Sequence, residues 1–243
     1  MAAEPRAFLP LTKPDAGAEL FAGLRSARRA DVATDDHVRV PPDRVGVVLR
    51  GAIVTECRSE DGTRFVDILG PEDLFGDGSF LARGPWTAME HRALVPARTV
   101  SMATSELWTL AGVRPEVSRL LVLALARSGE RLRLRTAILR TLPVADRVLA
   151  ILVELARRFG RPGSDGSAIP LPLTQELVAS LCGASRESVN RALAALRGRG
   201  AVRRAGGVYV VSAAAWSPTS ANAPAPSPGS VRATLPSRSS LSR

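Results

Sequence analysis

The chain contains little of several residue types on which metalloproteins and many enzymes depend. Among its 243 residues are two cysteines, two histidines and one lysine, and aromatic side chains make up 4%. Cys57 and Cys182 are too few for an iron–sulfur cluster or a zinc cage, so we expect no metal. The sequence also lacks a GxSxG motif and a Walker A motif, and it predicts a protein that is not an enzyme.

Long apolar runs are missing as well. The longest candidates are interrupted by Arg or Pro, so the sequence predicts no membrane span. The N-terminus, MAAEPRAFLPLTKPD, has no apolar core of the kind found in a signal peptide. We therefore expect a cytoplasmic protein in which the two cysteines form no structural disulfide.

Positive charge is concentrated in the second half of the chain. The net charge is +10, and residues 143–243 hold 13 arginines against 5 acidic residues. Residues 113–142 are also basic, whereas residues 1–112 are net negative. A strongly basic segment is typical of a surface that binds nucleic-acid phosphates.

Within the basic half, residues 173–196 read LTQELVASLCGASRESVNRALAAL, which predicts two short helices joined at Gly183. Thr174 and Ser185 are placed to cap the first and second helix, and glycine permits the tight turn between them. This layout is typical of a DNA-binding helix-turn-helix. The alternative is an ordinary amphipathic hairpin with solvated charges, and the basic flanks favour DNA.

The second of these helices has one apolar face and one polar face. The apolar stripe is Val189, Leu193 and Leu196. The other face carries Arg186, Glu187, Asn190 and Arg191. Arginine can grip guanine with two hydrogen bonds and glutamate can accept from cytosine, so this face suits the DNA major groove.

The first half of the chain predicts mostly strands. After a short helix around residues 20–24, short β-branched runs begin at Val45 and are punctuated by Gly51, by Asp61-Gly62 and by Gly70-Pro71. Further strands are expected at 93–95 and 99–102. Many short strands with turn signals at this spacing indicate a β-barrel or jelly roll.

Residues 114–142 predict one long helix. Apolar and small residues recur in it at heptad spacing, with an arginine included, which favours a parallel dimer seam over packing on its own domain. The positions of this expected seam are Leu121, Leu125, Ser128, Leu132, Arg135 and Leu139.

A further helix is expected at 146–159 and ends at Gly160 as a C′ glycine. A loop at 161–167 and a short extended segment at 169–173 lead into the helix-turn-helix. Two strands around Gly206-Gly207 form a wing, on which Arg203 and Arg204 either reach phosphates or are simply solvated. From residue 213 the chain is rich in Ala, Ser, Pro and Thr, and we expect it to be disordered.

These elements predict an α+β fold: an N-terminal double-stranded β-helix (jelly roll), a long dimerisation helix and a C-terminal winged helix-turn-helix. The expected boundaries are 1–112, 113–142, 143–212 and 213–243. In this order the parts resemble the Crp/Fnr family of bacterial transcription regulators. The motif LTQ…GASRESVNRAL resembles the family's DNA-binding signature, and EDGTRFVDILGPEDLFGDGSF resembles its cyclic-nucleotide-binding fold.

The resemblance implies roles for the helix-turn-helix residues. Arg186, Glu187 and Arg191 would read bases at a half-site similar to TGTGA, with Asn190 modulating the choice. Thr174 and Ser185 would contact phosphate. The implied partners are double-stranded DNA, a second copy of the chain and RNA polymerase.

The sensor half departs from the family pattern. Nucleotide-binding members have Gly-Glu-Leu followed about ten residues later by Arg-Ser-Ala, whereas this chain has Gly76-Asp77-Gly78 and Trp86-Thr87-Ala88. Asp77 is shorter than glutamate, and Trp86 replaces the arginine that pairs with the cyclic phosphate. The residues of this ligand site would be Gly76, Asp77, Trp86 and Thr87. We expect that neither cyclic AMP nor cyclic GMP binds, and that the pocket has collapsed.

The sequence is also compatible with two other interpretations, a haem-binding sensor and a module that docks on a protein. Haem-binding members need histidine or cysteine as axial ligands, and His37 and His91 are present, but a lone histidine is more often an ordinary surface or core residue. The chain could also be a nucleotide-binding regulatory or docking module that acts on a protein partner. The basic recognition helix and wing favour DNA over docking.

Overall fold

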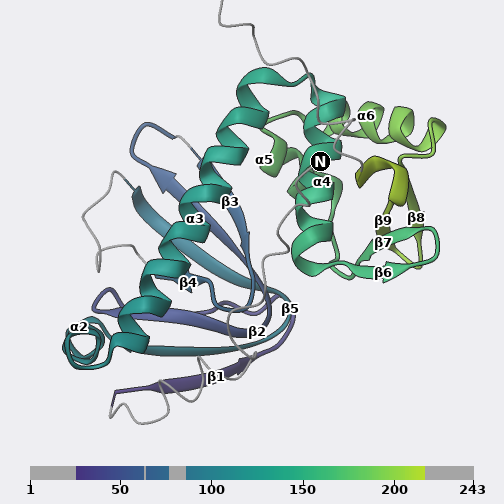
Figure 1. Ribbon diagram of the computed structural model, residues 1–243. Coiled ribbons are helices and arrows are strands. Elements are labelled where there is room, and N and C mark those ends of the chain that lie inside the picture. The colour runs from purple at the N-terminus through teal and green to yellow at the C-terminus, as the bar shows by residue number, and fades with distance from the viewer. Residues whose placement is uncertain (1–25, 63, 77–85, 217–243) are drawn as a thin grey trace, which may run out of the picture.

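A computed structural model describes residues 26–62, 64–76 and 86–216, with the backbone alone for residues 86–88 and 216. An antiparallel β-roll is followed by a long helix and by a C-terminal domain of helices and a small sheet (Figure 1). The expected α+β class, with its jelly roll and winged helix-turn-helix, is confirmed. The short helix expected around residues 20–24 lies outside the described residues.

The β-roll is built on two long, curved strands rather than on many short ones. These are β2 (Arg44–Ser59) and β5 (Trp86–Ala103), which pair along most of their length. The remaining strands are β1 (Arg28–Val32), β3 (Arg64–Leu69) and β4 (Leu74–Phe75). The sheet order is β1-β5-β2-β3, and β4 pairs with β2.

The prediction of separate short strands was therefore wrong. Gly51 does not end a strand: it lies within β2 at φ +79°, where the register of the β2–β5 ladder shifts. A Cβ at Gly51 would overlap the backbone of Pro96 on β5. Glycine thus permits a bulge that bends a continuous strand. The runs expected at 93–95 and 99–102 both belong to β5.

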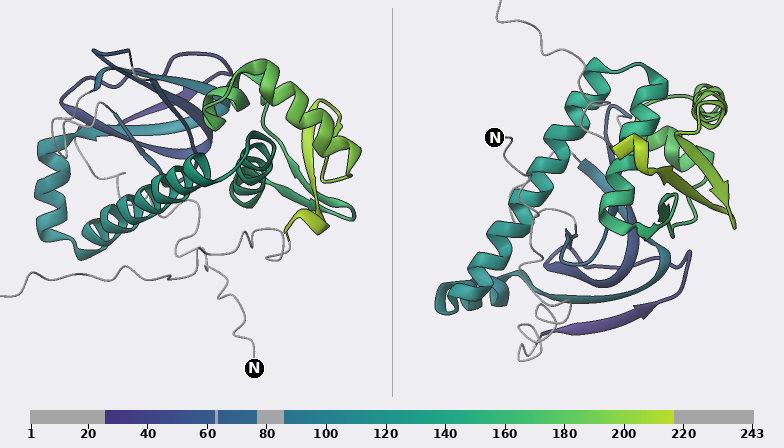
Figure 2. Two further views of the ribbon diagram at one scale, coloured as in Figure 1. Left: turned by 90° about the horizontal axis from the view of Figure 1, so that it is seen from above. Right: turned by 45° about the vertical axis from the view of Figure 1, so that its right-hand side comes forward.

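Three helices follow the roll: α2 (Thr104–Val113), α3 (Pro115–Thr141) and α4 (Val144–Phe159). The long helix predicted at 114–142 is confirmed as α3, which has Pro115 in its first turn and ends before Pro143. Helix α3 runs along the β-roll from α2 and leads to the C-terminal domain (Figures 1 and 2). Strand β1 and helix α2 were not expected from the sequence.

The C-terminal domain contains α5 (Gln175–Cys182) and α6 (Arg186–Gly198). Its sheet has the order β6-β7-β9-β8, from β6 (Arg161–Gly163), β7 (Gly166–Ile169), β8 (Val202–Ala205) and β9 (Val208–Ser212). The loop expected at 161–167 is thus part of a hairpin. The disorder expected from residue 213 is also contradicted at its start, where η1 (Ala213–Trp216) forms a 3-10 turn.

Gly160 ends α4, but not as the left-handed C′ glycine that we expected. Its φ of −68° and ψ of 149° are extended values open to any residue. Glycine is needed there for space, because a Cβ would overlap the carbonyl oxygen of Ala156 and the hydroxyl of Ser167. A glycine is needed at this position because the end of α4 packs closely against β7, and not because of a positive φ angle.

The expected dimer seam on α3 was wrong at two of its six positions. Leu121 is buried against the protomer's own β-roll. Arg135 is also buried, and it donates to the carbonyl oxygen of Val66 and to the Asp67 carboxylate of β3. An exposed apolar stripe remains on the helix, and its large members are Val122 and two of the expected seam positions, Leu125 and Leu132.

One hydrophobic core connects the two halves of the molecule. Ala52, Val54, Val66, Ile68 and Leu94 of the β-roll belong to the same buried cluster as the apolar faces of α4, α5 and α6. Two smaller clusters fill the rest of the roll. The C-terminal domain is therefore held against the roll by apolar packing.

Candidate nucleic-acid interface

Both helices of the helix-turn-helix are capped as expected. The Thr174 hydroxyl accepts from the backbone N–H of Leu177 at 3.1 Å, and the Ser185 hydroxyl accepts from that of Ser188 at 3.2 Å. Each such cap contributes about 1 kcal/mol to stability. Both hydroxyls lie at helix N-termini, where the backbone dipole favours an anion such as phosphate.

The turn between the helices depends on Gly183. This residue adopts a left-handed conformation, with φ +57° and ψ 45°, and its N–H closes the end of α5 on the carbonyl oxygens of Ala179 and Ser180. A side chain with a Cβ is strained in this region. Gly183 therefore fixes the angle between α5 and α6.

Helix α6 buries one stripe and exposes the predicted reading face. Val189, Leu193 and Leu196 are fully buried, together with Ala192. The four predicted readers, Arg186, Glu187, Asn190 and Arg191, are all exposed. The apolar stripe thus holds the helix in place while its polar face stays accessible, as insertion into a groove requires.

The structure adds one residue that the sequence analysis did not single out, Gln175. Its Nε2 donates to Oδ1 of Asn190 at 3.1 Å, across the two helices. Gln175 lines an open depression together with Ser185, Arg186, Glu187 and Asn190. Its position directly after the Thr174 cap was the available signal, since the first turn of α5 faces the start of α6.

The remaining polar contacts of α6 concern Arg191. Its Nη2 lies 3.4 Å from the Ser188 hydroxyl. The Ser188 hydroxyl also accepts a hydrogen bond from the Ser185 hydroxyl, at 3.0 Å. These are weak contacts between exposed groups. A competing hydrogen-bond partner can therefore displace them at little cost.

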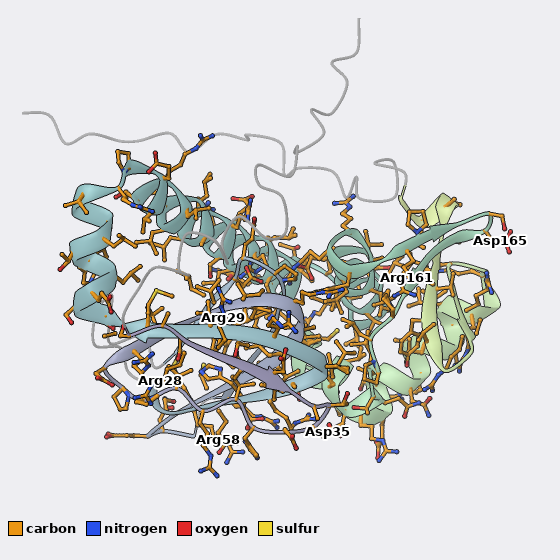
Figure 3. The ribbon with its side chains drawn as sticks, turned by 90° about the horizontal axis from the view of Figure 1, so that it is seen from below. Arg28, Arg29, Asp35, Arg58, Arg161 and Asp165 are labelled. Carbon is orange, nitrogen blue, oxygen red and sulfur yellow. The ribbon has the colours of Figure 1, made fainter. Side chains whose placement is uncertain are left out.

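The wing is formed by β8 and β9 around Gly206 and Gly207, both at positive φ. Arg203 pairs loosely with Asp165 at the tip of the β6–β7 hairpin, 3.4 Å away, and both side chains are mostly exposed. Figure 3 shows Asp165 projecting at this tip. Arg204 instead lies over the Tyr209 ring at 5.5 Å. The side chains of Arg203 and Arg204 therefore lie in different surroundings, because successive side chains on a strand point to opposite faces.

The predicted ligand site is described only in part. Gly76 follows β4 at φ +142°, where a Cβ would lie 3.2 Å from the carbonyl oxygen of Arg44. Asp77 lies outside the described residues, as do the side chains of Trp86 and Thr87, whose backbones begin β5. His91 is buried, with its Nδ1 3.0 Å from the Thr55 hydroxyl and its ring against Phe75.

Burial governs the chemistry of both cysteines. Desolvation raises the pKa of Cys57 to about 11, and the charges of Asp67 and Glu56 add to the effect. Desolvation likewise raises the pKa of Cys182 to about 12 against the opposing influence of Arg135 and Arg147. Within the described ranges no group of three His, Cys, Asp or Glu side chains is placed to hold a metal.

None of the helices in the described part of the chain is both long and apolar enough to cross a bilayer.

Comparison with known proteins places these features in a family. Residues 146–215 match the model of the Crp-like helix-turn-helix domain. The CRP-like cAMP-activated global transcriptional regulator of Mycobacterium tuberculosis is 36% identical over 173 residues, which are 71% of this chain and 77% of that protein. The global nitrogen regulator of Nostoc is 28% identical over 159 residues, 65% and 71% of the two chains.

Solved structures share the fold. FixK2 from Bradyrhizobium japonicum matches with a TM-score of 0.62 at 24% identity, over 76% of this chain and 92% of that one. The regulator CLP from Xanthomonas campestris matches with a TM-score of 0.63 at 20% identity, over 80% and 97%. The relatives are transcription regulators rather than enzymes. The chain belongs to the Crp/Fnr family of transcription regulators, with a Crp-like helix-turn-helix as its DNA-binding domain.

Proposed function

We propose that the protein binds a palindromic DNA site as a homodimer and reads each half-site with α6. The observation that carries this proposal is the exposed set of Arg186, Glu187, Asn190 and Arg191 on a helix whose opposite stripe is fully buried. The basic C-terminal half supplies the phosphate attraction. Family membership favours this function over docking to a protein partner.

The proposed roles of the readers follow from their hydrogen-bonding chemistry. Arg186 and Arg191 each grip a guanine through O6 and N7, and Glu187 accepts from cytosine N4. A half-site similar to TGTGA offers such bases. Thr174, Ser185, Arg203 and Arg204 contact phosphates, which fixes the position of the domain on the duplex.

A dimer seam is available on α3 at an exposed stripe that keeps Leu125 and Leu132 of the expected positions and leaves out the buried Leu121 and Arg135. Val122, Leu125, Gly129, Leu132 and Thr136 follow one another at three- and four-residue steps. Val122 is 64% and Leu132 46% exposed. At Gly129 a Cβ would meet only the end of Arg133, at 3.8 Å. Nothing in the described chain therefore requires glycine there, and the missing side chain leaves room for a second helix to approach closely.

Fluorescence anisotropy with labelled duplexes tests the proposal. We expect tight, salt-dependent binding to a palindrome whose half-sites are about one helical turn apart, and weaker binding to the same duplex with scrambled half-sites. Light scattering on purified protein should give a dimer at micromolar concentration. A strict monomer, or equal affinity for both duplexes, would contradict the proposed function.

We further propose that the effector pocket does not respond to cyclic nucleotides. The Mycobacterium tuberculosis relative is described as cAMP-activated. In this chain, however, Trp86 stands where the pattern of nucleotide-binding members has the phosphate arginine, and Asp77 where it has glutamate. Loss of a charge-assisted pair removes about 1.5–3 kcal/mol of binding free energy.

Titration calorimetry with cyclic AMP and cyclic GMP tests this part. We expect no measurable heat and no change in DNA affinity at millimolar ligand. The double variant Trp86→Arg, Asp77→Glu is the companion experiment: we expect it to remain without binding, because the pocket has collapsed. A micromolar dissociation constant for the unmodified protein would refute the proposal.

The proposal carries further expectations from the family resemblance. A regulator of this kind acts in the cytoplasm and contacts RNA polymerase at the promoter. Its parts divide as sensor (1–112), dimerisation helix (113–142), DNA-binding domain (143–212) and tail (213–243).

A further inference from the structure

Two buried carboxylates of the β-roll lie where three parts of the molecule meet. Asp67 is on β3, and Asp73 ends the turn that connects β3 to β4. Both are almost fully buried. Buried carboxylates are costly unless they are paired and hydrogen-bonded, so their partners show what holds the junction together.

Asp73 accepts hydrogen bonds from both helices at once. Its Oδ1 accepts from Nη1 of Arg131 on α3 at 2.8 Å. Its Oδ2 accepts from Nη2 of Arg158 on α4 at 2.9 Å, and also from the backbone N–H of Gly70 at 2.9 Å. One carboxylate therefore links the β-roll, the long helix and the first helix of the DNA-binding domain.

Neighbouring contacts fix the same junction. Nη2 of Arg158 also donates to the carbonyl oxygen of Ile68 at 2.7 Å, and its Nη1 donates to Glu154, one turn earlier on α4, at 3.0 Å. Arg135 of α3 reaches Asp67 at 3.0 Å. The end of α4 also packs closely on the β-roll, since a Cβ at Gly70 would overlap the ring of Phe159.

The turn itself carries backbone strain. Glu72 is one of two described non-glycine residues at positive φ, at +70°, and its carboxylate pairs with Arg127 of α3. Such a conformation persists only where the surroundings hold it. Arg127, Arg131 and Arg135 follow one another at four-residue steps, so one face of α3 is tied to the roll over two turns.

We infer that Asp73 is a positioning residue for DNA recognition, which sets the orientation of the helix-turn-helix relative to the dimerisation helix. This inference rests on the proposed binding of a palindrome by a dimer. In such a dimer α3 carries the seam and α4 carries the reading domain. The two ion pairs of Asp73 therefore fix how far apart, and at what angle, the two copies of α6 are presented. Arg158 is the matching residue on the reading domain.

The consequence is a preference for one half-site spacing. Anisotropy with a series of palindromes, lengthened or shortened by one and two base pairs, measures it. We expect the unmodified protein to prefer one spacing by about tenfold or more, because displaced half-sites lose base contacts. Asp73→Asn keeps the size of the side chain and removes its charge. We expect this variant to bind all spacings within about twofold of one another, while its affinity for a single half-site changes little.

The matched control is Asp31→Asn, which breaks an exposed Asp–Arg pair with Arg98 between β1 and β5. We expect it to keep the spacing preference of the unmodified protein. Should Asp73→Asn fail to fold, as judged by thermal melting, Arg158→Lys replaces it, since lysine keeps the charge but cannot bridge Asp73, Glu154 and Ile68 at once. A folded variant at either position with unchanged spacing preference would overturn the inference.

A second measurement needs no DNA. Spin labels at Arg29→Cys on β1 and Arg161→Cys on β6, both exposed (Figure 3), report the distance between roll and reading domain. The native cysteines are buried and leave the labelling specific. Doubly labelled protein is mixed with an excess of unlabelled protein, so that in a dimer only one subunit carries labels. We then expect one narrow distance distribution in the parent and a broad one with Asp73→Asn. Equal widths would refute the positioning role, even if the unmodified protein bound no DNA and the proposed function failed.

Discussion

The four proposed reading residues fall into two pairs on the surface of α6. Arg186 lies one turn before Asn190, and Glu187 lies one turn before Arg191, so each pair shares a face. All four are exposed. Asn190 is held by Gln175 from the neighbouring helix. Its orientation is therefore set before DNA arrives, while Glu187 and Arg191 remain available to adjust.

Removing a reading arginine should act on single bases. We expect Arg186→Ala or Arg191→Ala to cost about 1–3 kcal/mol in binding free energy and to relax preference at one position, because each removes two hydrogen bonds to guanine. Arg203→Ala should instead weaken all sequences alike and flatten the dependence on salt. Anisotropy over a panel of single-base variants measures both effects. The assignment of roles would be wrong if all three variants behaved alike.

The Gln175–Asn190 hydrogen bond should make these two residues act as a unit. We expect Gln175→Ala and Asn190→Ala to change base preference in the same way, and the double variant to add little to either. The comparison is a double-mutant cycle on DNA affinity. Gln175→Glu is a useful companion, since a carboxylate cannot donate to the Asn190 oxygen. Additive effects of the two alanine variants would contradict the coupling.

Both thiols should be inert in the folded protein. With pKa values of about 11 and about 12, Cys57 and Cys182 stay protonated at pH 8, and the thiolate is the reactive form. We expect no reaction with a disulfide reagent at pH 8 until denaturant is added. Unfolded thiols ionise at lower pH than these, so the stability that they contribute is lost as the pH rises from about 9 toward 12. Fast reaction of the native protein would contradict the burial of both side chains.

At the scale of elements, local signals were enough for the helix-turn-helix and for the long helix α3, but not for strand β1. Caps at Thr174 and Ser185 and a left-handed Gly183 are properties of neighbouring residues, so the sequence predicts α5 and α6 closely. Strand β1 has no alternation of apolar and polar residues, because it is an exposed edge. Its pairing with β5 is visible only in three dimensions.

The sequence also could not show which side of α3 is buried by the chain itself. Leu121 and Leu125 look equivalent in a heptad pattern, yet only Leu121 is buried by the protomer. Arg135 was placed in a seam because an ion pair with Asp67, distant in sequence, could not be foreseen. The ligand site is the remaining gap, since the structure describes Gly76 but not the side chains of Asp77, Trp86 and Thr87.

The exposed stripe on α3 gives a direct test of the dimer. We expect Leu132→Arg to shift the protein to monomer and to reduce affinity for the palindrome about 100-fold or more, while single half-site binding is kept, because a charge cannot be buried in an apolar seam. Leu134→Arg is the control, as Leu134 is similarly exposed but lies outside the stripe. Light scattering measures the oligomeric state. A dimer of unchanged stability in the Leu132 variant would exclude this seam.

At the scale of the whole molecule, the roll and the reading domain share one buried cluster. We therefore expect a single cooperative thermal transition for a full-length variant with a cavity in either half. Val66→Ala on β3 and Leu193→Ala on α6 should each cost about 2–4 kcal/mol and lower the midpoint seen by tryptophan fluorescence and by circular dichroism together. Two separate transitions would show that the halves fold independently.

That shared cluster also bears on how such regulators can diversify. A reading domain detached from this roll would lose Ala52, Val54, Val66, Ile68 and Leu94 from the shared cluster and would expose the apolar side chains that pack against them. Exposed patches of this kind promote aggregation. Grafting it onto the sensor of another regulator would succeed only if the new sensor offered a complementary apolar face. New DNA specificities are therefore more accessible to this chain through substitutions on the surface of α6 than through exchange of whole domains.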